Sequence, residues 1–153
     1  MVDLFSPLTL KGVTLRNRIG MSPMTMYRSV DGEMNDFHVM YLGARASGGF
    51  ALIFAEQIAI APEGRTSIHC AGIWDDAQVA GHARVTSMIK EMGAVAAIQL
   101  GHTGRNGSEV KPWVADMLGR QLPPDHPEGW QVVGPSDVPY GFGKRIYPVH
   151  ALT

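Results

Sequence analysis

The sequence predicts an α/β fold built from parallel βαβ units. Three apolar runs of strand length alternate with two segments of helical periodicity, and the connections between them are short. The run 50–55 is apolar throughout and 94–100 nearly so, which is typical of strands buried on both faces of a parallel sheet. This order of strand, helix, strand, helix and strand favours right-handed βαβ crossovers. We therefore expect one domain, with residues 1–153 belonging to it throughout.

The composition indicates which kinds of binding partner and which cell compartment to expect. The 153 residues fit the usual size of a single domain, and 13 basic against 14 acidic side chains give a net charge of −1. Without a basic face, neither nucleic acid nor an anionic membrane is an expected partner. Cys70 is the single cysteine and the first residues lack a signal-peptide pattern, which favours the cytoplasm. No apolar run approaches the roughly 20 residues that span a bilayer.

A hairpin is predicted ahead of the first strand. Residues 4–10 and 13–15 alternate with period two around Lys11-Gly12. We expect this hairpin to cover one end of the fold.

The first strand, 19–21, is expected to end at Pro23, which lacks a backbone donor. Ser22, Thr25 and Tyr27 place three hydroxyl groups within six residues of the following turn. Two interpretations remain open at this point: a functional turn, or an ordinary strand end with common turn residues.

The first helix is expected to begin after Asn35, a suitable N-cap, and to end at Gly48-Gly49. Its apolar face is predicted from residues at helical spacing: Phe37, Met40, Tyr41 and Ala44. The second strand, 50–55, is then followed by Glu56-Gln57 and by an irregular segment that contains the loop 61–65.

The second helix is expected after Asp75, another N-cap candidate, and to end at Gly93. Its predicted apolar stripe consists of Val79, Met88, Ile89 and Met92. The third strand, 94–100, is predicted to be buried. From residue 106 to 150, Gly, Pro, Trp and polar residues dominate, which is typical of a functional loop or of an excursion on a larger scaffold.

Polar residues occur at the same relative place near all three strands. In βα barrels the active site is built at the carboxyl ends of the strands, so these side chains are expected to converge: Ser22, Thr25, Glu56, Gln57, Gln99 and His102. An amide such as that of Gln99 is costly in a buried strand without partners. Gln99 therefore indicates either a polar ligand or a buried polar network.

Other common site patterns are not found in the sequence. The six histidines show no HExxH or paired ligand spacing, and His69-Cys70 would point in different directions, so we expect no metal site. The sequence contains no Rossmann fingerprint, no Walker loop and no nucleophile elbow.

Four ordered motifs carry a resemblance to a known family. NRIGMSPMTMY, LIFAEQIAIAPEGR, CAGIWDD and IQLGHTGR resemble the first part of the old yellow enzyme family of flavin-dependent ene-reductases, and look closest to its xenobiotic reductase subgroup. The similarity extends from Leu4 to Pro135. It implies a TIM (β/α)8 barrel with one non-covalent FMN, reduced by NADPH or NADH and reoxidised by an activated alkene such as an enone.

The resemblance also implies roles for individual residues. It places the backbone of residues 22–25 (Ser22, Pro23, Met24 and Thr25) against the flavin ring, with the Thr25 hydroxyl near the flavin O4, where a donor would stabilise the reduced ring. Gln99 matches the glutamine that pairs with the pyrimidine edge of the ring, and Tyr27 a tyrosine that faces the substrate. Gln57 is a departure, because the family usually has a small residue there. If its backbone meets the flavin, its side chain must turn away or reshape the pocket.

The resemblance implies that more of the barrel is needed, since the hairpin and three βα units account for three strands of eight. The substrate-binding pair, the proton donor and the phosphate site are expected in the missing C-terminal part, on the same or another chain. The sequence leaves open whether the protein forms a homo-oligomer. Two alternatives also remain: a non-catalytic structural or interaction role, and a barrel of this family acting as a dienoyl-CoA or amine oxidoreductase.

Overall fold

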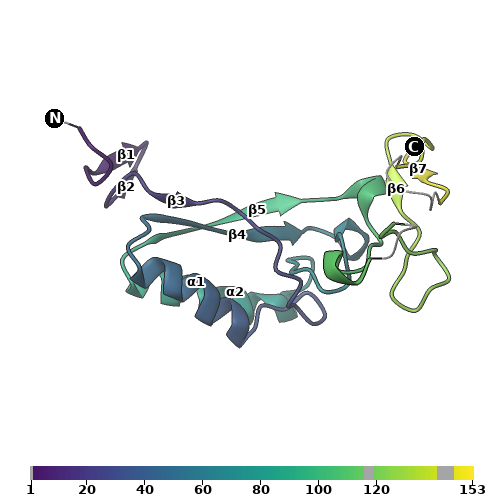
Figure 1. Cartoon of the computed structure of the whole chain (residues 1–153), viewed down its shortest axis with the longest axis horizontal. Coiled ribbons are helices and arrows are strands. Elements are labelled where there is room, and N and C mark those ends of the chain that lie inside the picture. The colour runs from purple at the N-terminus through teal and green to yellow at the C-terminus, as the bar shows by residue number, and fades with distance from the viewer. Residues whose placement is uncertain (1, 116–118, 141–146) are drawn as a thin grey trace.

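The computed structural model, which describes residues 2–115, 119–140 and 147–153, is organised around a three-stranded parallel sheet (Figure 1). The strands lie in chain order, β3-β4-β5, and each pair is parallel. Two helices connect them, as the sequence predicts. The bounds of these elements are β3 (Gly20–Met21), α1 (Asp36–Ser47), β4 (Leu52–Ala59), α2 (Val79–Glu91) and β5 (Val95–Gly101).

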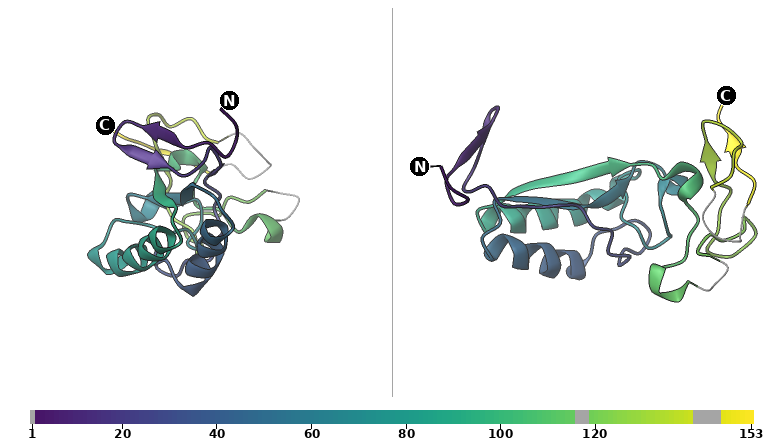
Figure 2. Two further views of the ribbon diagram at one scale, coloured as in Figure 1. Left: turned by 90° about the vertical axis from the view of Figure 1, so that its left-hand side faces the viewer. Right: turned by 45° about the horizontal axis from the view of Figure 1, so that its top comes forward.

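The predicted hairpin is confirmed, although its first strand is shorter than the expected 4–10. Strands β1 (Leu8–Leu10) and β2 (Val13–Leu15) pair antiparallel, and Lys11 in the turn has a φ of 52°. Figures 1 and 2 show the hairpin at the end of the sheet where the strands begin, while the loops that follow the strands lie at the opposite end.

Both predicted N-caps are found, but only Asn35 directly caps an α-helix; α2 itself begins after Gln78. The Asn35 side chain accepts a hydrogen bond from the Phe37 N–H at 3.1 Å, and His38 completes a capping box. Asp75 accepts from the Ala77 N–H at 2.9 Å and caps the 3₁₀ helix η2 (Asp76–Gln78), which leads into α2. These caps satisfy backbone donors that have no partner within the helix.

The predicted apolar faces of the helices are only partly right. In α1, Met40 is 60% exposed and Ala44 is also exposed, because the buried side of the helix is formed by residues four apart: His38, Leu42 and Ala46. In α2, Ile89 is buried as predicted, but Val79 is exposed and Val85 takes its place in the core.

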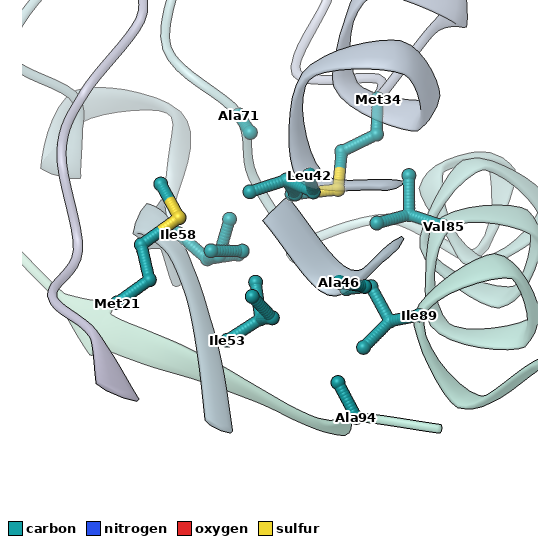
Figure 3. Close-up of a cluster of buried hydrophobic side chains, with 11 residues drawn as sticks. Met21, Met34, Leu42, Ala46, Ile53, Ile58, Ala71, Val85, Ile89 and Ala94 are labelled. Atoms are coloured by element: carbon teal, nitrogen blue, oxygen red, sulfur yellow. The ribbon is translucent and has the colours of Figure 1, made fainter. Parts of the chain in front are cut away.

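The core lies between the sheet and the two helices (Figure 3). Ile53 and Ile58 of β4 are fully buried and face Leu42 and Ala46 of α1 and Ile89 of α2 within one cluster. Burying an Ile side chain contributes about 1.5–3 kcal/mol. This cluster therefore fixes β4 relative to both helices, and the opposite face of β4 is left for the site.

The prediction that 94–100 is a buried strand is wrong for its second half. Gln99 and Leu100 are exposed, Leu100 to 61%, because β5 is an edge strand of the sheet. A groove of about 250 Å³ runs between α2 and β5 and is lined by Val85, Ile89 and Ile98 among others.

Short elements occupy the rest of the described chain: η1 (Pro62–Gly64), η3 (Gly104–Asn106), η4 (Pro112–Val114), and the parallel pair β6 (Val133–Gly134) and β7 (His150–Ala151). The predicted irregularity of 106–150 is confirmed where the structure describes it; residues 116–118 and 141–146 of that segment lie outside the described ranges. None of the helices in the described ranges has the length and apolar character to cross a membrane.

Candidate functional site

Strand β4 is longer than the sequence predicts, and this changes the position of Glu56 and Gln57. Both residues lie within β4 rather than after it. The pairing register with β5 shifts between Phe54 and Gln57, and such an irregularity re-aims side chains along a strand. Glu56 is 3% exposed and contacts α1, whereas the half-buried Gln57 takes part in the pairing with β5.

Gln57 and Gln99 are brought together as partners across β4 and β5. Paired residues of parallel strands share a face, and alternation from the buried Ile58 puts both amides on the face away from the helices. Gln99 is exposed there, so the expected buried amide is not found. Two amides, with donors and acceptors on each, therefore lie on the open face of the sheet close to the carboxyl ends of its strands.

The Gln57 side chain turns along its own face of the sheet toward Gly101. A Cβ atom at Gly101 would lie 2.8 Å from Gln57 Cγ and 2.9 Å from its Nε2. The Gln57 amide also donates to the Gly64 carbonyl at 3.5 Å, a long hydrogen bond. Gln57 thus occupies the space left by the missing side chain at position 101, which is how the larger residue is accommodated.

The turn after β3 runs alongside β4. Met21 pairs with Ile53, and the Met26 N–H donates to Glu56 Oε2 at 3.4 Å, so the residues between them lie next to this part of β4. Within the described ranges, no hydrogen bond inside the chain involves the backbone of Met24 or Thr25. Ser22 and Met24 are exposed and Thr25 is half-buried. The backbone of this turn is therefore available to a ligand.

A buried polar network on the side of α1 contacts that turn. His38 Nε2 lies 3.1 Å from Glu56 Oε1, and His38 Nδ1 lies 3.1 Å from the Asn35 backbone N. The two side chains of the His38–Glu56 pair are almost fully buried. The sequence offered one signal for Glu56, a carboxylate after an uninterrupted apolar run, and none for His38, whose partner is 18 residues away.

Tyr27 packs against the segment that follows β5. Its backbone is left-handed, with a φ of 57°, and its ring packs edge-on against Trp113 with centroids 5.6 Å apart. Burial raises the pKa of Tyr27, and a hydrogen bond from Arg120 offsets part of this rise. Arg120 also pairs with the buried Glu109 at 2.6 Å. Because Arg120 can only donate, the phenol keeps its own proton for another acceptor.

Of the other residues weighed in the sequence analysis, His102 has a structural role. The His102 Nδ1 accepts from the Gly104 N–H at 3.0 Å and so fixes the turn after β5. Burial raises the pKa of the Cys70 thiol to about 11, which argues against a nucleophilic role. Burial lowers the pKa of the neighbouring His69. No cluster of three or more metal-ligating side chains occurs among the residues that the structure describes.

Parallel strands in chain order, with helices on one face, form part of a βα barrel, a fold that builds its sites at the carboxyl ends of the strands, where these polar groups lie. The sequence profile of the NADH:flavin oxidoreductase / NADH oxidase family matches residues 3–145. The chain belongs to this family.

Similar proteins agree with this assignment. An NADPH dehydrogenase from Bacillus licheniformis is 52% identical over 144 residues, which are 93% of this chain and 37% of the relative. Among solved structures, morphinone reductase has 32% identity and a TM-score of 0.73, covering 98% of this chain and 39% of its own. An old yellow enzyme homologue from Zymomonas mobilis has 30% identity and a TM-score of 0.74, with 98% and 39% covered.

The chain therefore spans less than two fifths of the length of these relatives. The predicted fold class is confirmed: the chain has the fold of the first part of a TIM barrel, with the N-terminal hairpin and three strands of the barrel sheet.

Proposed function

We propose that residues 1–153 form the N-terminal part of a single FMN-binding barrel domain, which uses NADPH or NADH to reduce an activated alkene such as an enone. Membership of the family gives the class of reaction. The observation that carries the proposal is that Gln57 and Gln99 are paired near the carboxyl ends of their strands, while the turn after the neighbouring β3 leaves the backbone of Met24 and Thr25 without hydrogen bonds in the described chain. The remaining barrel, on the same chain or on a second one, is the necessary partner.

The polar groups at this end of the sheet fit the edge of a flavin ring. Amide and backbone groups are neutral donors and acceptors, which suit the uncharged heteroatoms of the ring. In this proposal the backbone of residues 22–25 and of Gln57 borders the ring, the Thr25 hydroxyl donates to it, and the Gln99 amide pairs with its pyrimidine edge. A phosphate site would come from the later strands.

When bound, FMN would supply the redox chemistry that connects NADPH or NADH to the alkene, namely hydride transfer. The chain's own residues prepare this step. Tyr27 forms a wall on the substrate side, and its phenol, whose pKa burial raises further above neutral, donates a hydrogen bond to the substrate. The Trp113 ring packs edge-on against the Tyr27 ring and supports its position.

The test is a chimera in which this chain replaces the matched 144-residue part of the Bacillus licheniformis NADPH dehydrogenase. We expect the purified chimera to bind FMN and to oxidise NADPH in the presence of a cyclic enone. Gln99→Leu, which keeps the size and removes the amide, should weaken FMN binding, and Ser87→Ala on the exposed side of α2 should not. A folded chimera that does not bind FMN, or one whose FMN binding is unchanged by Gln99→Leu, would overturn the proposal.

We also propose a cytoplasmic location. A chain whose one cysteine is free and buried suits a reducing compartment. Imaging of a tagged chain in cells tests the location, and the native mass of the chimera tests whether it forms a homo-oligomer.

A further inference from the structure

We propose that Glu56, held by His38, is a positioning residue that fixes the turn 24–27 against strand β4. Its importance for the flavin site rests on the proposed function, because this is the turn assigned to the ring and to Tyr27. The positioning itself is a property of the chain and can be measured without flavin.

The contacts form a continuous path from a helix start to the turn. The Asn35 backbone N lies 3.1 Å from His38 Nδ1, His38 Nε2 lies 3.1 Å from Glu56 Oε1, and Glu56 Oε2 lies 3.4 Å from the Met26 N. Asn35 and His38 belong to the capping box of α1, which fixes their geometry. The rigid start of α1 is thus connected through one carboxylate to the backbone of the turn.

The two hydrogen-bond donors that point at Glu56, from His38 and from the Met26 backbone, suit a carboxylate at this position. The Asn35 N–H donates to His38 Nδ1, which also lies 3.2 Å from Asn35 Oδ1; with Nδ1 as the acceptor of the backbone N–H, the imidazole proton is on Nε2 and is donated to Glu56. The Met26 N–H is the second donor that points at the same side chain. A carboxylate accepts both hydrogen bonds, one on each oxygen, whereas an amide has one oxygen and would place an NH₂ group against the other donor.

The turn has little else to hold it. Among the described residues, the bond from Met26 to Glu56 is the one hydrogen bond that connects the backbone of 24–27 to the rest of the chain. Directly after it, Tyr27 adopts a left-handed φ of 57°, which is unfavourable for a non-glycine residue. Such a conformation persists only where its surroundings impose it.

The test is Glu56→Gln in the chimera, read by hydrogen–deuterium exchange of the flavin-free protein. An unpaired buried donor should raise exchange of peptides covering 24–30 roughly 10- to 100-fold. Peptides from α2 and β5 should change little, because their contacts are untouched. With FMN added, the dissociation constant should rise about 5- to 50-fold for the same reason.

His38 provides the matched comparison. His38→Ala removes the donor to Glu56 and should loosen the turn as Glu56→Gln does. His38→Gln keeps a donor and is a favoured third residue of a capping box, so it should restore protection of the turn. Glu91→Gln makes the same chemical change at an exposed position and should have no effect. These milder changes keep the test decisive if Glu56→Gln does not fold.

The outcomes separate this inference from the proposed function. Unchanged exchange of 24–30 in Glu56→Gln, or a change spread evenly over the whole domain, would overturn the positioning role. Loosening of the turn in a chimera that never binds FMN would support the positioning role and would count against the proposed function alone.

Discussion

The fit between Gln57 and Gly101 gives the most direct test of the side-chain arrangement on the open face of the sheet. Gly101→Ala would put a methyl group 2.8 Å from Gln57 Cγ and 2.9 Å from Nε2. Gln57 must then leave its rotamer, at about 0.5–1.5 kcal/mol, and give up its long bond to Gly64. Replacing a strand glycine by alanine otherwise stabilises by roughly 0.5–1 kcal/mol. We therefore expect Gly101→Ala to be neutral or slightly destabilising.

In a Gln57→Ala background the methyl group meets no side chain, and the same Gly101→Ala change should stabilise. Urea unfolding of the four members of this double-mutant cycle in the chimera should give a coupling of about 1 kcal/mol. Gly12→Ala is the control, since a Cβ there has no atom within 4 Å, and it should not couple to Gln57. Free energies that add within about 0.5 kcal/mol for Gly101 and Gln57 would refute this arrangement.

Four further outcomes are expected. Thr25→Ala in the chimera should lower the flavin potential by about 10–30 mV through loss of one hydrogen bond, and an unchanged potential would remove Thr25 from the site. Tyr27→Phe should lower kcat/KM for an enone roughly 2- to 10-fold while FMN still binds; loss of FMN would make Tyr27 part of the scaffold. Because the pKa of Cys70 is raised to about 11, only about one thiol in a thousand is ionised at pH 8, so iodoacetamide should label the folded chimera slowly and the urea-unfolded one fast; equal rates would contradict that burial. Residues 1–153 expressed alone should be insoluble or colourless, because β3 and β5 each leave an edge unpaired, and a soluble yellow product active on enones would contradict this expectation.

Local features were predictable from the sequence, because each depends on neighbouring residues only. The Asn35 and Asp75 caps and the Lys11 turn satisfy nearby backbone groups or select a turn geometry. The order of the strands in the sheet was also predictable, because parallel βα units with short connections place successive strands side by side.

Features that depend on distant partners were not predictable. The buried side of α1 includes His38 because Glu56 lies opposite it, and a search for apolar spacing passes over such a residue. The same holds for Tyr27, whose packing partner Trp113 comes from a segment without periodicity. Strand β4 was predicted too short because polar residues were taken to end it, whereas Glu56 is buried by its pairing with α1.

The order β3-β4-β5, identical to the order of synthesis, has a consequence for how the chain folds on the ribosome. Each strand can pair with the strand made just before it, and each helix can cover the pair as it emerges, so no early contact waits for a distant segment. The growing sheet then presents the edge of its newest strand until the following unit is made. Pauses in translation directly after β5 would prolong that exposure, and codon choice in this part of the gene should therefore affect the yield of folded protein.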